Sequence, residues 1–277
     1  MTTQQRRILV IGIGAGDPDY LTLGAVKAMG RADVFFIVGK GAGTSALTDL
    51  RHRMLDEHAR APYRVVEVDD PSRDRRPMGR GDYTTAVHDW RARRADIFEG
   101  LLRDEMTADE TAAFLVWGDP SLYDSTLGIL ATIEARGSLS TSVEVIPGIS
   151  SVSALAARHR IPLNQVGRPL HITPARRLSD VGRNDDGDIV VMLDAHESFT
   201  EVEGDVWIYW GAYLGTPDEL LVAGPLREVS DRIRQMHAEA RDRHGWIMDT
   251  YLLRIVERPG PGPAADVRDD GGAGGIR

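Results

Sequence analysis

The chain has no cysteine among its 277 residues, and this absence excludes disulfide bonds, thiol catalysis and thiolate metal sites. It also lacks any apolar run near the roughly 18–20 residues that cross a membrane. The first strand-like run begins at Ile8, which leaves no room for a signal peptide ahead of it. Together these absences predict a cytoplasmic protein with no membrane partner.

Lysine is nearly missing as well, with only Lys27 and Lys40, whereas arginine is abundant. The formal net charge of −9 argues against nucleic acid as a partner, because phosphate binding needs a basic face. The arginine excess has two interpretations: the coding bias of a GC-rich genome, or side chains that pair with carboxylates in a bidentate way. The eight histidines show no ligand spacing, so the sequence predicts no metal site.

The N-terminal half alternates strand and helix signals, a pattern typical of a mostly parallel sheet with right-handed crossovers. The expected strands are residues 8–13, 34–38, 64–68, 113–117 and 142–146. The expected helices are residues 22–29, 82–105, 125–136 and 150–159, with Gly30 and Gly137 as C-caps and Ser150 as an N-cap. This half therefore predicts an α/β domain.

The C-terminal half contains shorter strand-like runs and one long amphipathic stretch. The expected strands are residues 171–173, 188–193, 205–210, 220–222 and 246–256, and the expected helix is residues 226–244. Their lengths and loops predict a second α/β domain with a mixed sheet. Pro and Gly near residues 160–169 mark a boundary, which gives domains at residues 1–167 and 168–258. Residues 259–277, rich in Pro, Gly, Ala and Asp, predict a disordered tail.

Three short turns rich in Gly, Pro, Asp and Ser follow strand-like runs in the N-terminal half. The first turn is residues 12–18 (GIGAGDP), the second turn is residues 117–123 (WGDPSLY) and the third turn is residues 146–151 (IPGISS). Such residues make sharp turns and expose backbone N–H groups. Because the carboxyl ends of parallel strands meet at one edge of a sheet, we expect the three turns to form one site.

The first turn carries three glycines at alternate positions, as a dinucleotide-binding loop does. That fingerprint needs a glycine where this chain has Asp17, whose carboxylate would repel a pyrophosphate. No Lys-Ser or Lys-Thr pair follows, which excludes a phosphate-binding P-loop. Two interpretations remain: Asp17 caps the helix behind it, or it belongs to an anionic loop at the mouth of a cleft.

The second turn offers the carboxylate of Asp119 beside Gly118, where a ligand can approach the backbone closely. An acidic turn suits a ligand with positive charge and hydroxyl or amine donors, and S-adenosylmethionine has a sulfonium, an ammonium and a ribose diol. The alternative is an ordinary strand-to-helix turn capped by Asp119. The third turn opens a helix of small residues, which allows close packing of a flat ligand or of another helix.

In order and spacing, the three turns resemble the signatures of the tetrapyrrole methylases, an S-adenosylmethionine-dependent family that includes the precorrin methyltransferases. The first resembles G-x-G-P-G-D-P-x-x-L-T-L-x-A, with Ala15 in place of the proline. The second is similar to G-D-P-x-x-Y and the third to V-x-V-I-P-G-x-S-S. The resemblance covers residues 8 to about 256 and implies two α/β domains with a ligand groove between them. It also implies a homodimer.

By this resemblance the methyl donor, S-adenosylmethionine, lies in the groove between the domains. The residues implied to contact it are Trp117, Gly118, Asp119, Leu122, Ser150 and Ser151 from the first domain, and Leu193 and Ala212 from the second. The last two belong to the end of residues 190–193 and to an expected turn at residues 210–212. Methyl transfer is an in-line displacement, in which catalysis is mainly alignment of the two reactants.

A long insertion at about residues 44–110, together with residues 246–253, resembles the deacetylating branch of the family, which serves aerobic cobalamin synthesis. The reaction that this implies is methylation of a ring carbon of a precorrin with release of acetate. Deacetylation needs a general base and polarisation of a carbonyl. Asp17 is the candidate base, and Tyr20 and Tyr123 are candidate donors.

The implied substrate is a polycarboxylate, and an acidic protein needs local positive charge to bind it. The candidate source is a run of arginines, although a solvated helix face explains the same run: Arg73, Arg75, Arg76, Arg80, Arg91, Arg93 and Arg94.

Other functions stay open at this point. Within the family they are methylation of another precorrin, of uroporphyrinogen, of a diphthamide precursor or of ribosomal RNA, and the negative charge counts against RNA. Outside the family they are a nucleotide-dependent oxidoreductase, which Asp17 opposes, and a binding protein that keeps the fold without catalysis.

Overall fold

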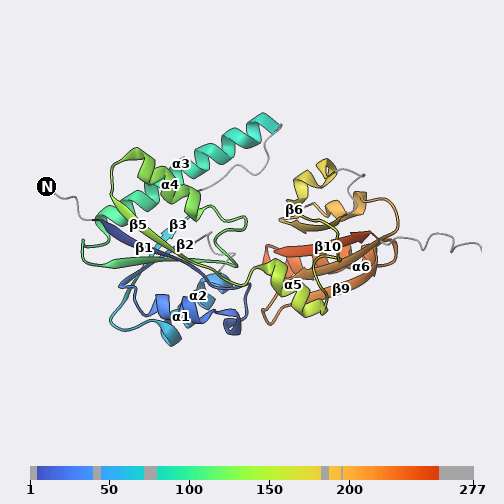
Figure 1. Ribbon diagram of the computed structural model, residues 1–277, viewed down its shortest axis with the longest axis horizontal. Coiled ribbons are helices and arrows are strands. Elements are labelled where there is room, and N and C mark those ends of the chain that lie inside the picture. Colours follow the sequence, from blue (N-terminus) through green and yellow to red (C-terminus); the bar gives the residue numbers. More distant parts are fainter. Residues whose placement is uncertain (1–4, 40–44, 72–79, 182–186, 195, 256–277) are drawn as a thin grey trace, which may run out of the picture.

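The computed structural model describes residues 5–39, 45–71, 80–181, 187–194 and 196–255, and it consists of two α/β domains side by side along its long axis (Figure 1). Each domain is built on one five-stranded sheet. All the predicted strands form, although several begin or end a few residues away from the predicted positions. The predicted tail at residues 259–277 lies outside the described residues.

The first sheet has the strand order β3-β2-β4-β1-β5. Its strands are β1 (Arg6–Gly12), β2 (Val34–Gly39), β3 (Arg64–Asp69), β4 (Thr111–Val116) and β5 (Thr141–Ile146). Neighbouring strands pair in parallel throughout, so their carboxyl ends share one edge, which faces the second domain in Figure 1. The predicted parallel sheet is confirmed.

Helices cover both faces of this sheet. The two faces alternate along β1, where Ile8 and Val10 lie in one core and Leu9 and Ile11 in the other. The first face packs α3 (Arg80–Asp104) and α4 (Thr126–Arg136), and the second packs α1 (Leu23–Met29) and α2 (Ser45–His58). The caps at Gly30 and Gly137 form as predicted.

Helix α2 is absent from the helices expected on sequence grounds. Its buried side chains are Leu50, Met54 and Leu55, while most of the remaining described positions are polar. An apolar stripe this narrow gives a weak helical periodicity, so packing against the sheet rather than local pattern secures the helix.

The second sheet is mixed and has the order β6-β7-β10-β8-β9. Its strands are β6 (Leu170–Pro174), β7 (Asp188–Met192), β8 (Val206–Ala212), β9 (Leu220–Pro225) and β10 (Asp249–Ile255). Strands β6 and β7 pair in parallel, and the other neighbours are antiparallel. This confirms the predicted mixed sheet. Helix α6 (Leu226–His244) covers one face together with the 3-10 helices η3 (Ala175–Asp180) and η4 (Ser198–Glu201).

Helix α5 (Ser151–His159) covers the opposite face of the second sheet. Its Val152 and Leu155 pack in one core with Val190 of β7 and Leu252 of β10. A boundary at residues 167/168 leaves this helix in the first domain, whereas its buried side chains lie against the second. The third turn, which leads from β5 into α5, is therefore the passage of the chain from one sheet to the other.

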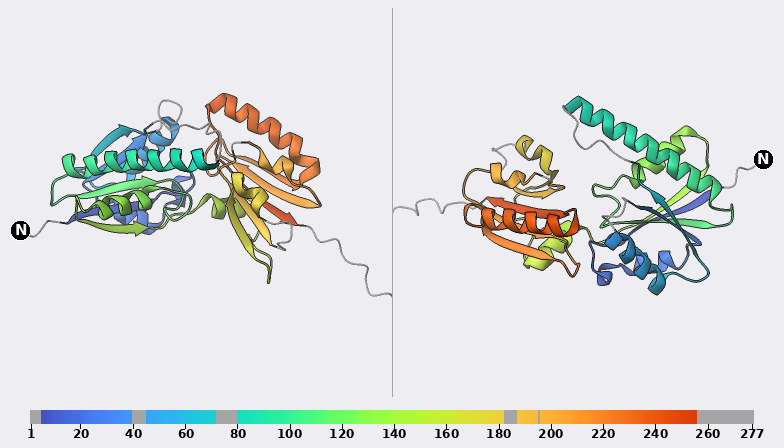
Figure 2. Two further views of the ribbon diagram at one scale, coloured as in Figure 1. Left: turned by 90° about the horizontal axis from the view of Figure 1, so that it is seen from above. Right: turned by 180° about the vertical axis from the view of Figure 1, so that it is seen from behind.

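Seen from above and from behind, the N-terminal end of α3 extends beyond the first sheet towards the second domain (Figure 2). Within the described ranges no helix has both the length and the apolar character that crossing a membrane requires.

Candidate active site between the two domains

The three turns meet, and glycines make the meeting possible. A Cβ on Gly148 would lie 2.1 Å from the carbonyl oxygen of Gly118 and 2.9 Å from Cα of Gly12. The first and second turns also exchange backbone hydrogen bonds, because the N–H of Gly14 donates to Gly118 (3.2 Å) and the N–H of Gly118 donates to Gly14 (2.8 Å). Residues far apart in the sequence thus form one main-chain cluster at the carboxyl edge of the first sheet, as predicted.

Asp119 joins the second turn to the third. Its Oδ2 accepts the backbone N–H of Gly148 at 2.9 Å, and its Oδ1 accepts the N–H and the hydroxyl of Ser121. Burial raises the pKa of Asp119, but these hydrogen bonds outweigh it and hold the pKa below its ordinary value. The carboxylate is therefore ionised at neutral pH and binds its own turns, as the capping interpretation requires.

The first turn lies against the second domain. Asp17 caps the 3-10 helix η1 (Pro18–Tyr20), since its Oδ1 accepts the N–H of Asp19 at 2.9 Å. A Cβ on Gly16 would lie 2.7 Å from the carbonyl oxygen of Leu214, and one on Gly215 would lie 2.7 Å from the N of Asp17. Tyr20 packs in the same core as Leu214. Asp17 thus caps η1 and also lies at the contact between the two domains.

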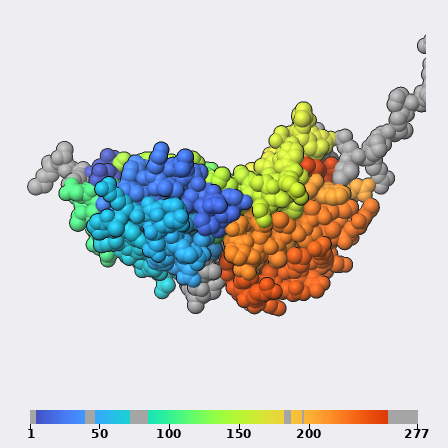
Figure 3. Space-filling view, turned by 90° about the horizontal axis from the view of Figure 1, so that it is seen from below, coloured from blue at the N-terminus to red at the C-terminus, as the bar shows by residue number. Residues whose placement is uncertain are grey.

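Further contacts connect the domains around the turns. The hydroxyl of Tyr123 donates to the carbonyl of Ile172 in β6 at 3.1 Å. The hydroxyl of Thr250 in β10 donates to that of Ser151 at 3.0 Å. The surface is indented where the two lobes meet (Figure 3). The predicted donor-binding residues Gly118, Asp119, Ser150 and Ser151 therefore gather where the first domain meets the second.

Strained backbone occurs in loops of both domains. Tyr123, Leu193 and Tyr213 have φ angles of 52°, 60° and 50°, in the left-handed region that L-residues rarely occupy. Leu193 follows β7 directly and is 55% exposed, an unusual position for a large apolar side chain. Such outliers cluster at binding and catalytic sites. Burial raises the pKa of Tyr213 to about 12, so its hydroxyl stays protonated and donates to the carbonyl of Trp246.

Among the predicted donor contacts, Ala212 lies in a different local structure from the one expected. Ala212 is fully buried in the core under α6, and residues 210–212 belong to strand β8 rather than to a turn. The expected turn at 210–212 is thus wrong; the strand runs two residues further and the chain turns at Tyr213–Gly215. Ser150 caps α5 as predicted, with its hydroxyl accepting the N–H of Ser153 at 3.2 Å. Leu122 packs in the interdomain core.

The arginines of the predicted run differ in their exposure to solvent. The side chains of Arg73, Arg75, Arg76 and Arg80 lie outside the part that the structure describes, and Arg91 and Arg93 are exposed. Arg94 instead points inward, where its Nε lies 2.9 Å from Asp70 and its Nη1 donates to Ser125 at 2.8 Å. The solvated-face interpretation is therefore wrong for Arg94, whose burial lowers its pKa against the opposing charge of Asp70.

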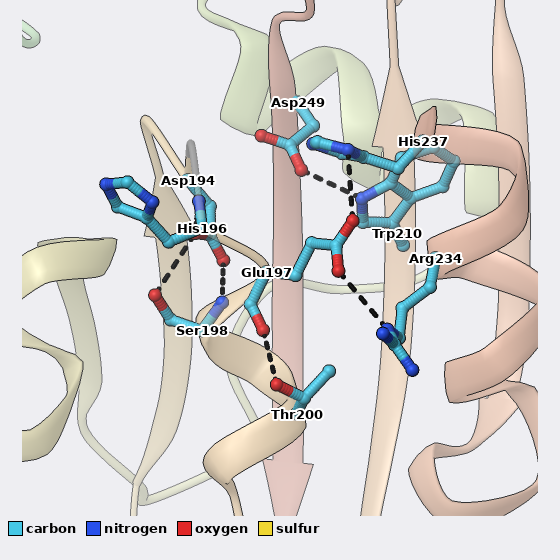
Figure 4. Close-up of polar contacts among 9 residues, drawn as sticks. All are labelled: Asp194, His196, Glu197, Ser198, Thr200, Trp210, Arg234, His237 and Asp249. Atoms are coloured by element: carbon cyan, nitrogen blue, oxygen red, sulfur yellow. Dashed lines mark hydrogen bonds and ion pairs between the residues drawn. The ribbon is translucent and has the colours of Figure 1, made fainter. Parts of the chain in front are cut away.

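A buried polar cluster in the second domain was missed on sequence grounds (Figure 4). Asp194 is 3% exposed and accepts hydrogen bonds from the N–H groups of His196 and Ser198 and from the hydroxyl of Tyr251. Asp249 accepts the indole N–H of Trp210 at 3.0 Å. Burial raises the pKa of Asp249 to about 7, and the neighbouring Asp194 adds to the effect.

Glu197 closes the same cluster towards α6, with its carboxylate 3.2 Å from Arg234 and 3.3 Å from Nδ1 of His237. No residue pattern predicted the cluster, because its acids come from two distant segments, residues 194–197 and residue 249, and follow no motif spacing. The described part of the chain contains no group of three or more His, Asp or Glu side chains arranged to hold a metal ion.

Comparison with known proteins identifies the class of this site. Residues 7–230 match the model of the family described as tetrapyrrole (corrin/porphyrin) methylases. The chain therefore belongs to this family of methyltransferases, and the match does not favour an oxidoreductase.

Individual relatives narrow the class further. The chain is 47% identical over 251 residues to a precorrin-6A synthase (deacetylating) of Sinorhizobium sp, covering 90% of this chain and 95% of the relative. It superposes on the crystal structure of a cobalamin synthesis related protein (CobF) from Corynebacterium diphtheriae with a TM-score of 0.79 and 37% identity, covering 91% of this chain and all of that one. A uroporphyrin-III C-methyltransferase from Thermus thermophilus, described as complexed with S-adenyl homocysteine, shares the fold, with a TM-score of 0.51, 18% identity, and 90% and 92% coverage.

Proposed function

We propose that this chain is an S-adenosylmethionine-dependent C-methyltransferase of corrin synthesis that converts precorrin-5 to precorrin-6A. The reaction methylates ring carbon C-1 and releases acetate. The observation that carries the proposal is the 47% identity over 90% of the chain to a precorrin-6A synthase (deacetylating). The convergence of the three turns at the indentation between the domains supports it, because such a reaction needs two ligands aligned in one groove.

The residues around the turns suit the methyl donor. S-adenosylmethionine supplies an electrophilic methyl group when bound. The indole Nε1 of Trp117 is buried and has no acceptor in the described part of the chain, so a ligand acceptor would satisfy it. Leu193 offers exposed apolar surface, and the ionised Asp119 favours a cation nearby. We infer that Asp119 acts mainly by holding the second and third turns together, with Gly118 and Ser151 beside it.

For the deacetylation half, the chain offers Asp17, Tyr20 and Tyr123. Only one carboxylate oxygen of Asp17 accepts a hydrogen bond in the described part of the chain, which leaves Oδ2 able to take a proton from water. The hydroxyl of Tyr123 now donates to Ile172, and it must give up this acceptor to polarise an acetyl carbonyl. Asp17 as base and the two tyrosines as donors thus remain our assignment.

We further infer a homodimer in the cytoplasm, as is usual for the family. Sedimentation of the purified chain tests the dimer, and a monomer at micromolar concentration would contradict it.

The function is tested by incubating the protein with precorrin-5 and methyl-labelled S-adenosylmethionine. We expect acetate and a product that carries one more methyl group. Methylation without acetate would leave the chain a tetrapyrrole methylase with a different substrate position, and no methylation at all would refute the proposal. Calorimetric titration adds a direct readout: S-adenosylmethionine is expected to bind and NAD is not.

The variant Asp119→Ala tests the role of the turns. It leaves the N–H of Gly148 without its acceptor, so we expect donor affinity to fall at least tenfold. Asp231→Ala, which changes a fully solvated carboxylate on α6, is the matched control and should bind the donor as the wild type does.

A further inference from the structure

Strands β2 and β4 of the first sheet stop pairing before they reach the carboxyl edge, where the three turns lie. The ladder between β2 and β4 ends at the pair Phe36 and Phe114, although β2 continues to Gly39 against β3 and β4 continues to Val116 against β1. The carbonyl of Val116 accepts the N–H of Ile13 on the β1 side. Because successive carbonyls point to opposite sides of a strand, the carbonyl of Leu115 faces the gap towards β2.

Arg51 of α2 reaches into this gap. Its Nε donates to the carbonyl of Leu115 and its Nη1 to that of Leu47, both at 3.4 Å. Among the residues that the structure describes, no carboxylate forms an ion pair with this guanidinium. An arginine has five N–H donors in a planar fork, so at least three donors of Arg51 have no acceptor among the residues that the structure describes. Burial lowers its pKa, and the charge of Asp124 opposes that effect.

Arg94 on the opposite face of the sheet provides the contrast. It too lies close to Asp124, but it also has Asp70 at 2.9 Å and the hydroxyl of Ser125 at 2.8 Å. Asp124 itself is engaged, since its Oδ1 caps α4 at the N–H of Thr126. Arg94 is therefore neutralised and held in place, whereas the remaining donors of Arg51 have no such partner within the described ranges. A partly buried cation with unmet donors is costly unless an anion completes it.

We propose that Arg51 binds a peripheral carboxylate of the tetrapyrrole substrate at the carboxyl edge of the first sheet, beside the second turn. This inference rests on the proposed function, because it takes its ligand class from a polycarboxylate tetrapyrrole. Arginine suits that ligand, since its fork matches a carboxylate in a bidentate pair. The carboxylate selects and orients the ring, and Arg51 takes no part in the chemical step.

The test compares Arg51→Gln, Arg51→Lys and the control Arg53→Gln, which changes an exposed arginine on the same helix. Precorrin-5 turnover is expected to show a KM raised tenfold or more for Arg51→Gln, with kcat within about threefold. The dissociation constant of S-adenosylmethionine should not change. The lysine variant keeps the charge without the fork, so an intermediate KM is expected, and Arg53→Gln should match the wild type. An unchanged KM in both Arg51 variants would overturn the proposal, even where thermal stability falls.

A binding readout separates this proposal from the proposed function. Uroporphyrin, a stable fluorescent tetrapyrrole polycarboxylate, is titrated into each variant, and its methyl ester serves as the uncharged probe. We expect the wild type to bind the acid form more tightly than the ester. In Arg51→Gln the ratio of the two dissociation constants, ester over acid form, should fall at least tenfold. If the wild type binds the acid form but does not turn over precorrin-5, the function fails and the carboxylate site stands. If Arg51→Gln keeps the full preference, the carboxylate site fails alone. Should the glutamine variant not fold, a lysine variant with wild-type affinity for the acid form overturns the proposal.

Discussion

The two domains hold the turns at the ends of their strands by different means. In the first domain, backbone packs directly on backbone at Gly12, Gly118 and Gly148, with Asp119 as the polar link. In the second, the loop after β7 is held by the buried carboxylate of Asp194. An edge made of glycine contacts tolerates no added volume, whereas an edge held by buried acids is sensitive to charge and hydrogen bonding. The two halves of the site are therefore expected to fail in different ways.

The largest effect is expected from Gly148→Ala in the first domain. The new Cβ would lie 2.1 Å from the carbonyl oxygen of Gly118, so the three turns must separate. We expect a loss of about 4 kcal/mol of unfolding free energy, above the usual range for overpacking because backbone rather than side chains must move. Donor binding should disappear. Denaturant unfolding and calorimetry measure the two effects.

Gly128→Ala is the control for this substitution. Gly128 lies exposed in α4, and a Cβ there meets nothing within 4 Å. Alanine should stabilise that helix by about 1 kcal/mol. Equal, mild effects at both glycines would show that the contact of the three turns is looser than the structure indicates.

Asp249→Asn tests whether a buried acid of the second domain makes stability depend on pH. The pKa of Asp249 lies at about 7 in the folded chain against an ordinary value of 3.8. Between these values the folded state keeps a proton that the unfolded state has lost, so Asp249 contributes stability below pH 4 that is lost as the pH rises to 7. The variant has no titratable group at this position. Relative to the wild type, its free energy of unfolding should therefore rise by about 4 kcal/mol as the pH increases from 4 to 7. Its side-chain oxygen still accepts the Trp210 indole. Parallel stability curves from pH 4 to 8 would contradict the assignment.

Asp194→Asn is expected to cost less than the glycine change. An amide NH2 replaces one carboxylate oxygen: at Oδ1 the N–H of His196 loses its acceptor, and at Oδ2 the N–H of Ser198 does. The hydroxyls of Ser198 and Tyr251 can turn to accept from the amide instead. One unmet buried donor costs about 2 kcal/mol. Asp231→Asn, on the exposed side of α6, should leave the unfolding free energy unchanged. Because Asp194 holds the loop that follows Leu193, donor affinity should fall together with stability.

The contrast between the domains also explains what the sequence could predict. The turns of the first domain are visible as letters, because Gly, Pro and Asp at fixed spacing are what parallel strands need at their carboxyl ends. Asp194 and Arg51 have no such signature: each becomes informative only when the end of β7 meets β10, or α2 meets β4. The turn expected at residues 210–212 was wrong for a related reason, since Gly211 suggests a turn but lies within β8.

Leu193→Gly is expected to have the smallest effect on stability. It also tests most directly whether the second domain contributes to donor binding. Leucine at a φ of 60° carries about 1 kcal/mol of backbone strain. Glycine removes the strain but adds a similar conformational entropy to the unfolded chain, so the unfolding free energy should stay within about 0.5 kcal/mol of the wild type. Donor affinity should nonetheless fall several-fold, because the exposed apolar side chain is lost. Leu23→Gly near the start of α1, where leucine is 78% exposed, should lower stability slightly and leave donor affinity intact. Wild-type donor affinity in Leu193→Gly would mean that the strain at the end of β7 serves the loop alone, and that the donor is held by the first domain.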